Sequence, residues 1–109
     1  MEKERTTDTV LNDLKEVVES GKMVSPEVWL TAAFTLNLLE IDENMLRNKM
    51  RQDVAKSKLA IYKAQEKKNV AAAEMEIEAT DAYRMLRDQE DKIDSVKEFI
   101  MIAKKNSDY

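Results

Sequence analysis

Gly21 and Pro26 are the only glycine and the only proline of this 109-residue chain, and both lie in its first quarter. Glycine disfavours a helix interior by about 1 kcal/mol relative to alanine, and proline by about 3 kcal/mol. From residue 27 to residue 109 neither residue type interrupts the chain, and apolar residues recur every three or four positions. This pattern predicts an all-α fold with a few long helices and no sheet.

A short amphipathic helix is predicted over residues 8–20. Thr6 or Thr7 can accept a hydrogen bond from the backbone amides at its start. Apolar side chains at three- and four-residue spacing form one stripe along it, and Gly21 can end it in the left-handed conformation. We therefore expect a first helix that packs by a single face.

A second, much longer helix is predicted to begin at Pro26, because proline needs no amide partner in the first turn of a helix. Its apolar register continues past Asp42, where the helix could bend, and the helix is predicted over residues 26–78. It would be roughly 80 Å long at 1.5 Å per residue. The apolar stripe of so long a helix must be buried by a partner helix, so we expect a chain reversal near residue 80. A last helix over 81–105 would then lie antiparallel on 54–78, completing a coiled-coil-like hairpin in a single helical domain of residues 1–109.

The residue types that are missing limit the chemistry. The chain has no histidine and no cysteine, so it lacks the usual general base and any thiolate nucleophile. A single glycine excludes a glycine-rich phosphate loop. We therefore expect a protein that is not an enzyme, with no catalytic residue, no cofactor, no metal site and no small-molecule substrate.

The location of the protein is predicted from two further absences. The chain has no cysteine, and its first residues lack the apolar region of a signal peptide. The apolar run over residues 28–41 is too short and too polar to span a bilayer. We expect a cytoplasmic protein without membrane contact, located in the host cytoplasm if a phage encodes it.

Charge is distributed unevenly along the second half of the chain. Residues 45–69 carry eight basic and two acidic groups, whereas residues 70–95 carry three basic and eight acidic groups. A basic helix face can follow the phosphates of single-stranded DNA, and an aromatic ring can stack on a base. The alternative is a basic face neutralised within the hairpin by the acidic last helix. The predicted nucleic-acid-binding residues are Arg47, Lys49, Arg51, Lys56, Lys58, Tyr62 and Lys63.

Two segments are more apolar than one buried stripe requires. They lie near the start of the long helix and near the end of the last helix. Their side chains can fill a multi-helix core of the chain itself, or they can be covered by other copies or by a partner protein. The predicted oligomer or partner interface consists of Trp29, Phe34, Leu38, Phe99, Ile100 and Ile102.

The layout of segments resembles a known family. A short amphipathic helix with Leu11–Glu16 leads into Ser25–Ala33, a long Lys/Arg/Ala-rich helix runs from Met50 through Lys68, and a terminal helix ends with Phe99–Lys105. This layout resembles the small helical bacteriophage proteins that accompany single-strand DNA recombination genes, including the UvsY-type recombination mediators. The resemblance implies ring-like oligomers and contacts to single-stranded DNA from the long helix. The basic residues at the analogous positions are Arg47, Arg51, Lys56, Lys58 and Lys63.

These observations predict a non-enzymatic, oligomeric accessory protein of phage or bacterial DNA metabolism that binds protein partners and single-stranded DNA. Two alternatives stay open. One is a phage-encoded inhibitor of a host defence enzyme, acting through an acidic face that mimics nucleic acid, and the other is a plain coiled-coil scaffold. The acidic face would consist of Glu74, Glu78, Asp81, Asp88 and Asp91.

Overall fold

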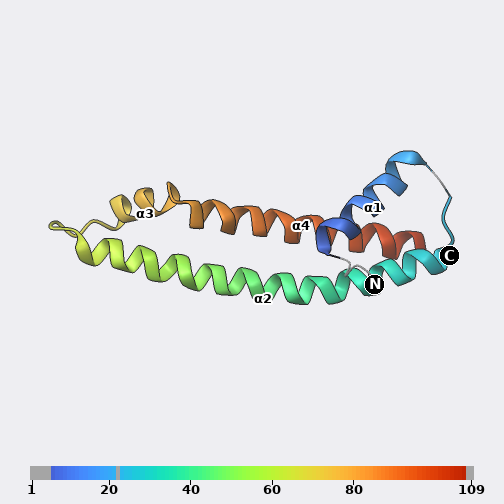
Figure 1. The fold of residues 1–109 in the computed structure, drawn as a ribbon, viewed down its shortest axis with the longest axis horizontal. Coiled ribbons are helices and arrows are strands. Elements are labelled where there is room, and N and C mark those ends of the chain that lie inside the picture. Colours follow the sequence, from blue (N-terminus) through green and yellow to red (C-terminus); the bar gives the residue numbers. More distant parts are fainter. Residues whose placement is uncertain (1–5, 22, 108–109) are drawn as a thin grey trace, which may run out of the picture. The chain divides into compact units, whose positions relative to one another are not determined.

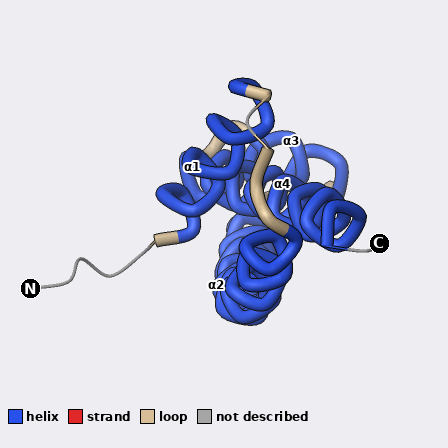
Figure 2. Tube along the Cα trace, turned by 90° about the vertical axis from the view of Figure 1, so that its right-hand side faces the viewer, coloured by secondary structure: helices blue, strands red, loops and turns tan. Residues whose placement is uncertain are grey.

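The computed structural model describes residues 6–21 and 23–107, and its regular secondary structure in these ranges is entirely α-helical. The helices, in chain order, are α1 (Thr7–Ser20), α2 (Pro26–Ala64), α3 (Val70–Glu78) and α4 (Asp81–Ser107) (Figure 1). Figure 2 shows the same elements with the loops that join them. The all-α prediction is confirmed, including a pair of long helices, α2 and α4, that pack against each other. None of the helices in the described ranges combines the length and the apolar character needed to cross a membrane.

The described residues form two compact units, whereas the sequence predicts a single helical domain. Unit 1 contains the residues up to Asp42 and those from Ile93 onward, and unit 2 contains Glu43–Lys92. Helices α2 and α4 each contribute one part to unit 1 and another part to unit 2. Each unit is described by itself below.

Helix α1 has the start and the end that its sequence predicts. The Thr6 hydroxyl oxygen accepts a hydrogen bond from the Thr9 backbone amide at 3.2 Å. Gly21 has a φ of 67°, in the left-handed region, and its amide donates to the Val18 carbonyl. A Cβ at Gly21 would meet no atom within 4 Å, so the backbone conformation, and not crowding, favours glycine there.

Three helices share the core of unit 1. Leu36 of α2 and Val96 of α4 are completely buried, and they cluster with Val10 of α1. A second cluster joins Trp29 of α2 to Ala103 of α4. Apolar residues of α1, α2 and α4 thus converge on one interior, which explains why the short helix α1 is stable although helices of its length are marginal in isolation.

The predicted extent of the second helix is wrong. Helix α2 ends at Ala64, and the chain reverses direction in the loop 65–69 instead of near residue 80. Helix α3 then returns along the end of α2 (Figure 1). There Lys58 of α2 forms an ion pair with Glu74 of α3. The hairpin is therefore antiparallel as predicted, but α3 and not the last helix covers the end of α2.

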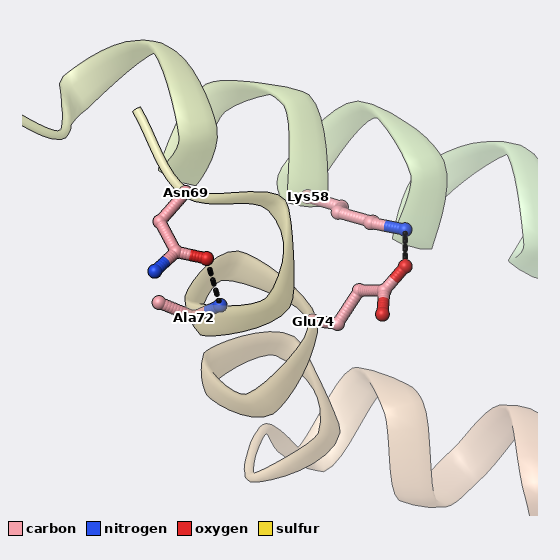
Figure 3. A network of polar contacts seen from close by, with 4 residues as sticks. All are labelled: Lys58, Asn69, Ala72 and Glu74. Atoms are coloured by element: carbon pink, nitrogen blue, oxygen red, sulfur yellow. Dashed lines mark hydrogen bonds and ion pairs between the residues drawn. The ribbon is translucent and has the colours of Figure 1, made fainter. Parts of the chain in front are cut away.

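The loop 65–69 contains the physical reason for this early reversal. Its five residues, Gln-Glu-Lys-Lys-Asn, are all polar, so no apolar side chain extends the stripe of α2. The Lys68 ammonium donates to the backbone carbonyls of Lys63 and Gln65 and satisfies acceptors that the end of a helix leaves open. The Asn69 side-chain oxygen accepts from the Ala72 amide at 3.2 Å and caps the start of α3 (Figure 3).

The last helix begins at Asp81, where the sequence predicts its start. The Thr80 hydroxyl donates to the Ile77 carbonyl at 2.6 Å and accepts from the Tyr83 amide at 3.3 Å. One side chain thus satisfies an acceptor at the end of α3 and a donor at the start of α4. Helix α4 extends to Ser107, two residues beyond the predicted range of 81–105.

The core of unit 1 makes a prediction about two leucines of α2. Leu36 is 0% exposed and Leu38 is 67% exposed. Truncating a fully buried leucine to alanine leaves a cavity, so we expect Leu36→Ala to lower the free energy of unfolding by about 2–5 kcal/mol. We expect Leu38→Ala to change it by less than about 0.5 kcal/mol. Urea unfolding followed by circular dichroism measures both values, and equal losses for the two variants would contradict this packing.

Candidate interaction surfaces

An exposed apolar stripe lies on α2 in unit 1. Leu30, Phe34, Leu38 and Ile41 are 49%, 64%, 67% and 57% exposed. Steps of four, four and three residues keep all four on one side of the helix. The buried residues of the same segment, Trp29, Ala33 and Leu36, lie on a different side, about 130° away around the helix. We refer to Leu30, Phe34, Leu38 and Ile41 as the α2 stripe.

The surroundings of the α2 stripe are acidic. The segment 26–42 carries no basic residue. Its exposed carboxylates, Glu27 and Asp42, fall on the side of the stripe, whereas the half-buried Glu40 falls on the side of Trp29 and Leu36. A surface with an apolar centre and charges of one sign around it favours a partner whose flanking charges have the opposite sign. The stripe is thus suited to a basic amphipathic segment.

The structure separates the six residues of the predicted interface into two groups. Phe34 and Leu38 belong to the α2 stripe and are exposed. Trp29 and Ile100 are buried, and Phe99 and Ile102 pack against the two core clusters of unit 1. These last four side chains fill the core of the chain itself, which is the alternative that the sequence left open.

Sequence reasoning did not single out Leu30 and Ile41, which complete the stripe. The signal was present, because both continue the helical spacing of Phe34 and Leu38 on one side of α2. Almost every side of the segment 28–41 carries apolar residues, so the spacing alone does not tell the buried side from the exposed side.

Two residues of the basic segment 45–69 form ion pairs with α3 and α4 within unit 2. Arg51 forms an ion pair with Glu90 at 2.9 Å, and Lys58 forms one with Glu74 at 2.8 Å (Figure 3). Arg47 is half-buried, and its Nε atom is buried without a hydrogen-bond partner among the described residues. Intramolecular neutralisation, the alternative to nucleic-acid binding, therefore applies to Arg51 and Lys58.

A second line of basic residues has a different environment. Lys49, Lys56 and Lys63 are exposed, and their ammonium groups form no ion pair within residues 6–21 and 23–107. Steps of seven residues place successive ammonium groups about 10 Å apart along one side of α2. Tyr62 is half-buried, and the Lys68 ammonium lies 5.8 Å from the centre of its ring.

The acidic residues of unit 2 do not form a metal site. Glu74 is engaged by Lys58, and Asp81 lies 3.5 Å from Arg84. Glu78, Asp88 and Asp91 are exposed. In the part of the chain that the structure describes, no group of three or more acidic side chains converges closely enough to hold a metal ion.

A buried polar contact joins α4 to α2 inside unit 2. The side-chain amide of Gln89, which is buried, donates to the Glu43 carbonyl at 2.9 Å and to the Glu43 carboxylate at 2.6 Å. In the heptad pattern of α4, Gln89 occupies one of the positions that face the neighbouring helix, and an apolar residue would ordinarily fill it. This contact fixes the register of the two helices, because only one alignment brings Gln89 to Glu43.

Comparison of the chain with family models, with curated proteins and with solved structures gives no match. The resemblance to phage recombination mediators therefore stays a prediction. Two surfaces of the molecule support a function: the α2 stripe and the exposed Lys49, Lys56 and Lys63, which we call the outer lysines.

The Gln89 contact is testable by truncation. Hydrogen bonds to charged groups contribute about 1.5–3 kcal/mol, so we expect Gln89→Ala to lower the free energy of unfolding by about that amount. The neighbouring exposed Asp88 provides the control, and Asp88→Ala should change it by less than about 0.5 kcal/mol. Urea denaturation measures both, and a Gln89→Ala variant as stable as the control would show that the contact does not hold the two helices.

Proposed function

We propose that this chain is a non-enzymatic accessory protein that binds a helix of a protein partner on the α2 stripe. The observation that supports this proposal is the exposure of four large apolar side chains in one line, on a helix whose other side is already buried. Contiguous exposed apolar surface of this kind marks interaction sites in water-exposed proteins. The spacing of the stripe is the one by which helices pack side by side.

The chemistry of the partner follows from the charges beside the stripe. The exposed carboxylates of Glu27 and Asp42 lie on the side of the stripe, and the segment 26–42 has no basic residue. An amphipathic helix with leucine along one side and lysine or arginine beside it would bury its apolar face and pair its flanking charges. We therefore infer a basic amphipathic helix as the occupant.

A synthetic helix tests this inference directly. The probe is a fluorescent peptide of about five turns with leucine at heptad positions and lysine at the flanking positions. We expect it to bind the full chain with a dissociation constant in the micromolar range, or about −8 kcal/mol. Phe34→Glu should weaken this binding at least about tenfold, because it places a charge in the middle of the stripe. Fluorescence anisotropy measures the affinities.

Two controls make the peptide experiment specific. Met101→Glu changes an equally exposed apolar residue on α4 of unit 1, outside the stripe, and should leave the affinity unchanged. A peptide with glutamate in place of lysine should bind more weakly, since its charges would face carboxylates. Binding that is unaffected by Phe34→Glu, or equal affinity for the two peptides, would refute the proposed site.

A role in DNA metabolism is the second candidate function. It is supported by one specific observation, the line of exposed ammonium groups of Lys49, Lys56 and Lys63 on α2, which form no ion pair with any residue that the structure describes. Such a line can contact the phosphates of single-stranded DNA, although the chain as a whole has a net charge of −4. Because Arg51 and Lys58 are held in ion pairs, we place the DNA contact on the outer lysines.

This second candidate predicts unequal effects for two pairs of basic residues. We expect Lys56→Gln with Lys63→Gln to reduce low-salt binding of a labelled oligothymidine about tenfold or more. The matched pair, Arg51→Gln with Lys58→Gln, removes the same charge from residues already paired with carboxylates and should have a much smaller effect. Anisotropy at several salt concentrations measures both. No binding of the unmodified chain at low salt would remove DNA from its functions.

A further inference from the structure

An open apolar groove lies between α2 and α4 within unit 2. It has a volume of about 270 Å³. Leu46, Met50 and Val54 line it from α2, and Ala82 and Met85 line it from α4. Leu46 is 42% exposed and Met85 is 57% exposed, so the groove is open to solvent.

Few side chains of unit 2 are buried around this groove. No residue of α2 between positions 43 and 64 is buried, and the buried residues of the unit are Ala73, Ile77, Leu86 and Gln89. A helical hairpin with so little burial loses much of the hydrophobic stabilisation that a larger helix bundle would provide. Coverage of the groove by further helices would supply it.

Two charged residues on α2 form the rim of the groove. Lys49 and Asp53 both line it, one helical turn apart. Neither side chain forms an ion pair with the other or with any residue in the described ranges. The rim thus presents one positive and one negative charge beside an apolar surface, and both are available to an outside partner.

We propose that a second copy of this chain covers the groove, with α2 packed antiparallel on α2 of the other copy across a two-fold axis between Lys49 and Asp53. Lys49 of each copy then meets Asp53 of the other, and both pairs form at once. Leu46 and Met50 lie beside these pairs, on the side of α2 that faces the groove, and are buried with Met85 against the other copy. The two hairpins combine into a four-helix bundle, an arrangement in which facing helices share one apolar core.

The charges of the rim select this arrangement from the other ways of pairing two copies. A two-fold contact joins the same surface of both copies, so every charge must find its complement on an identical surface. Antiparallel helices place position 49 against position 53, which pairs opposite charges. Parallel helices would place Lys49 against Lys49, and the like charges would repel. This surface is distinct from the α2 stripe, which belongs to unit 1, so the two proposals can fail independently.

Charge reversal followed by mixing tests the proposal. We expect the unmodified chain to sediment as a dimer at about 100 µM, as a micromolar dissociation constant requires. Lys49→Asp and Asp53→Lys should each weaken self-association about tenfold or more. In the dimer of either variant, both contacts between position 49 of one copy and position 53 of the other bring like charges together. An equimolar mixture of the two variants should recover the affinity of the unmodified chain as a heterodimer, since every opposed pair is again Lys with Asp. Analytical ultracentrifugation measures the masses, and native mass spectrometry identifies the heterodimer.

Substitutions in the groove provide an independent readout. Met85→Glu should dissociate the dimer, whereas Met75→Glu changes a more exposed methionine of α3 outside the groove and should not. Circular dichroism confirms that each variant keeps its helix content. A monomeric unmodified chain at about 100 µM would overturn the proposal. So would a mixture of Lys49→Asp and Asp53→Lys that associates no more tightly than either variant alone, or a dimer that Met85→Glu leaves intact. A dimer that forms normally with Phe34→Glu separates this surface from the α2 stripe.

Discussion

The chain reversal at residues 65–69 is the constraint on which unit 2 depends. It ends α2 at Ala64 and returns the chain along it, so that Glu74 of α3 and Glu90 of α4 form ion pairs with Lys58 and Arg51 of α2. The exposed ion pairs contribute little stability, about 0–1 kcal/mol each. Their consequence concerns the charge along α2, because they engage Arg51 and Lys58, whereas Lys49, Lys56 and Lys63 are exposed and form no ion pair within the described residues.

One side of helix α2 is buried within the chain, and another side is exposed to solvent. In unit 1, Leu36 and Trp29 pack against α1 and α4, while the stripe from Leu30 to Ile41 stays in solvent. In unit 2 the same helix contributes no buried residue, and its groove beside α4 stays open. A chain that needed only to fold would bury these side chains itself. Their exposure is the physical basis for expecting partners, a basic helix on the stripe and a second copy on the groove.

Much of the fold could be predicted from the sequence, because caps and breakers have local causes. Thr6, Gly21 and Thr80 act at helix ends through their own backbone neighbours, and each was recognisable. The loop 65–69 cannot be recognised in the sequence, because glutamine, glutamate and lysine are also good helix formers. Its one distinctive residue is Asn69, whose capping role needs the turn to exist already. The stripe was found only in part, since Phe34 and Trp29 differ in environment through tertiary packing that the spacing of a densely apolar segment does not encode.

One distance tests the reversal most directly. The chain has no native cysteine, so Lys58→Cys and Glu74→Cys can carry a pair of nitroxide labels without interference. Electron paramagnetic resonance, with labelled protein diluted in unlabelled protein, reports the separation within one chain. Because the side chains at these positions touch, the account predicts strong dipolar coupling at a distance well below 24 Å. A continuous helix through residues 65–69 would hold the labels about 24 Å apart, and a narrow distribution at that distance would contradict the account.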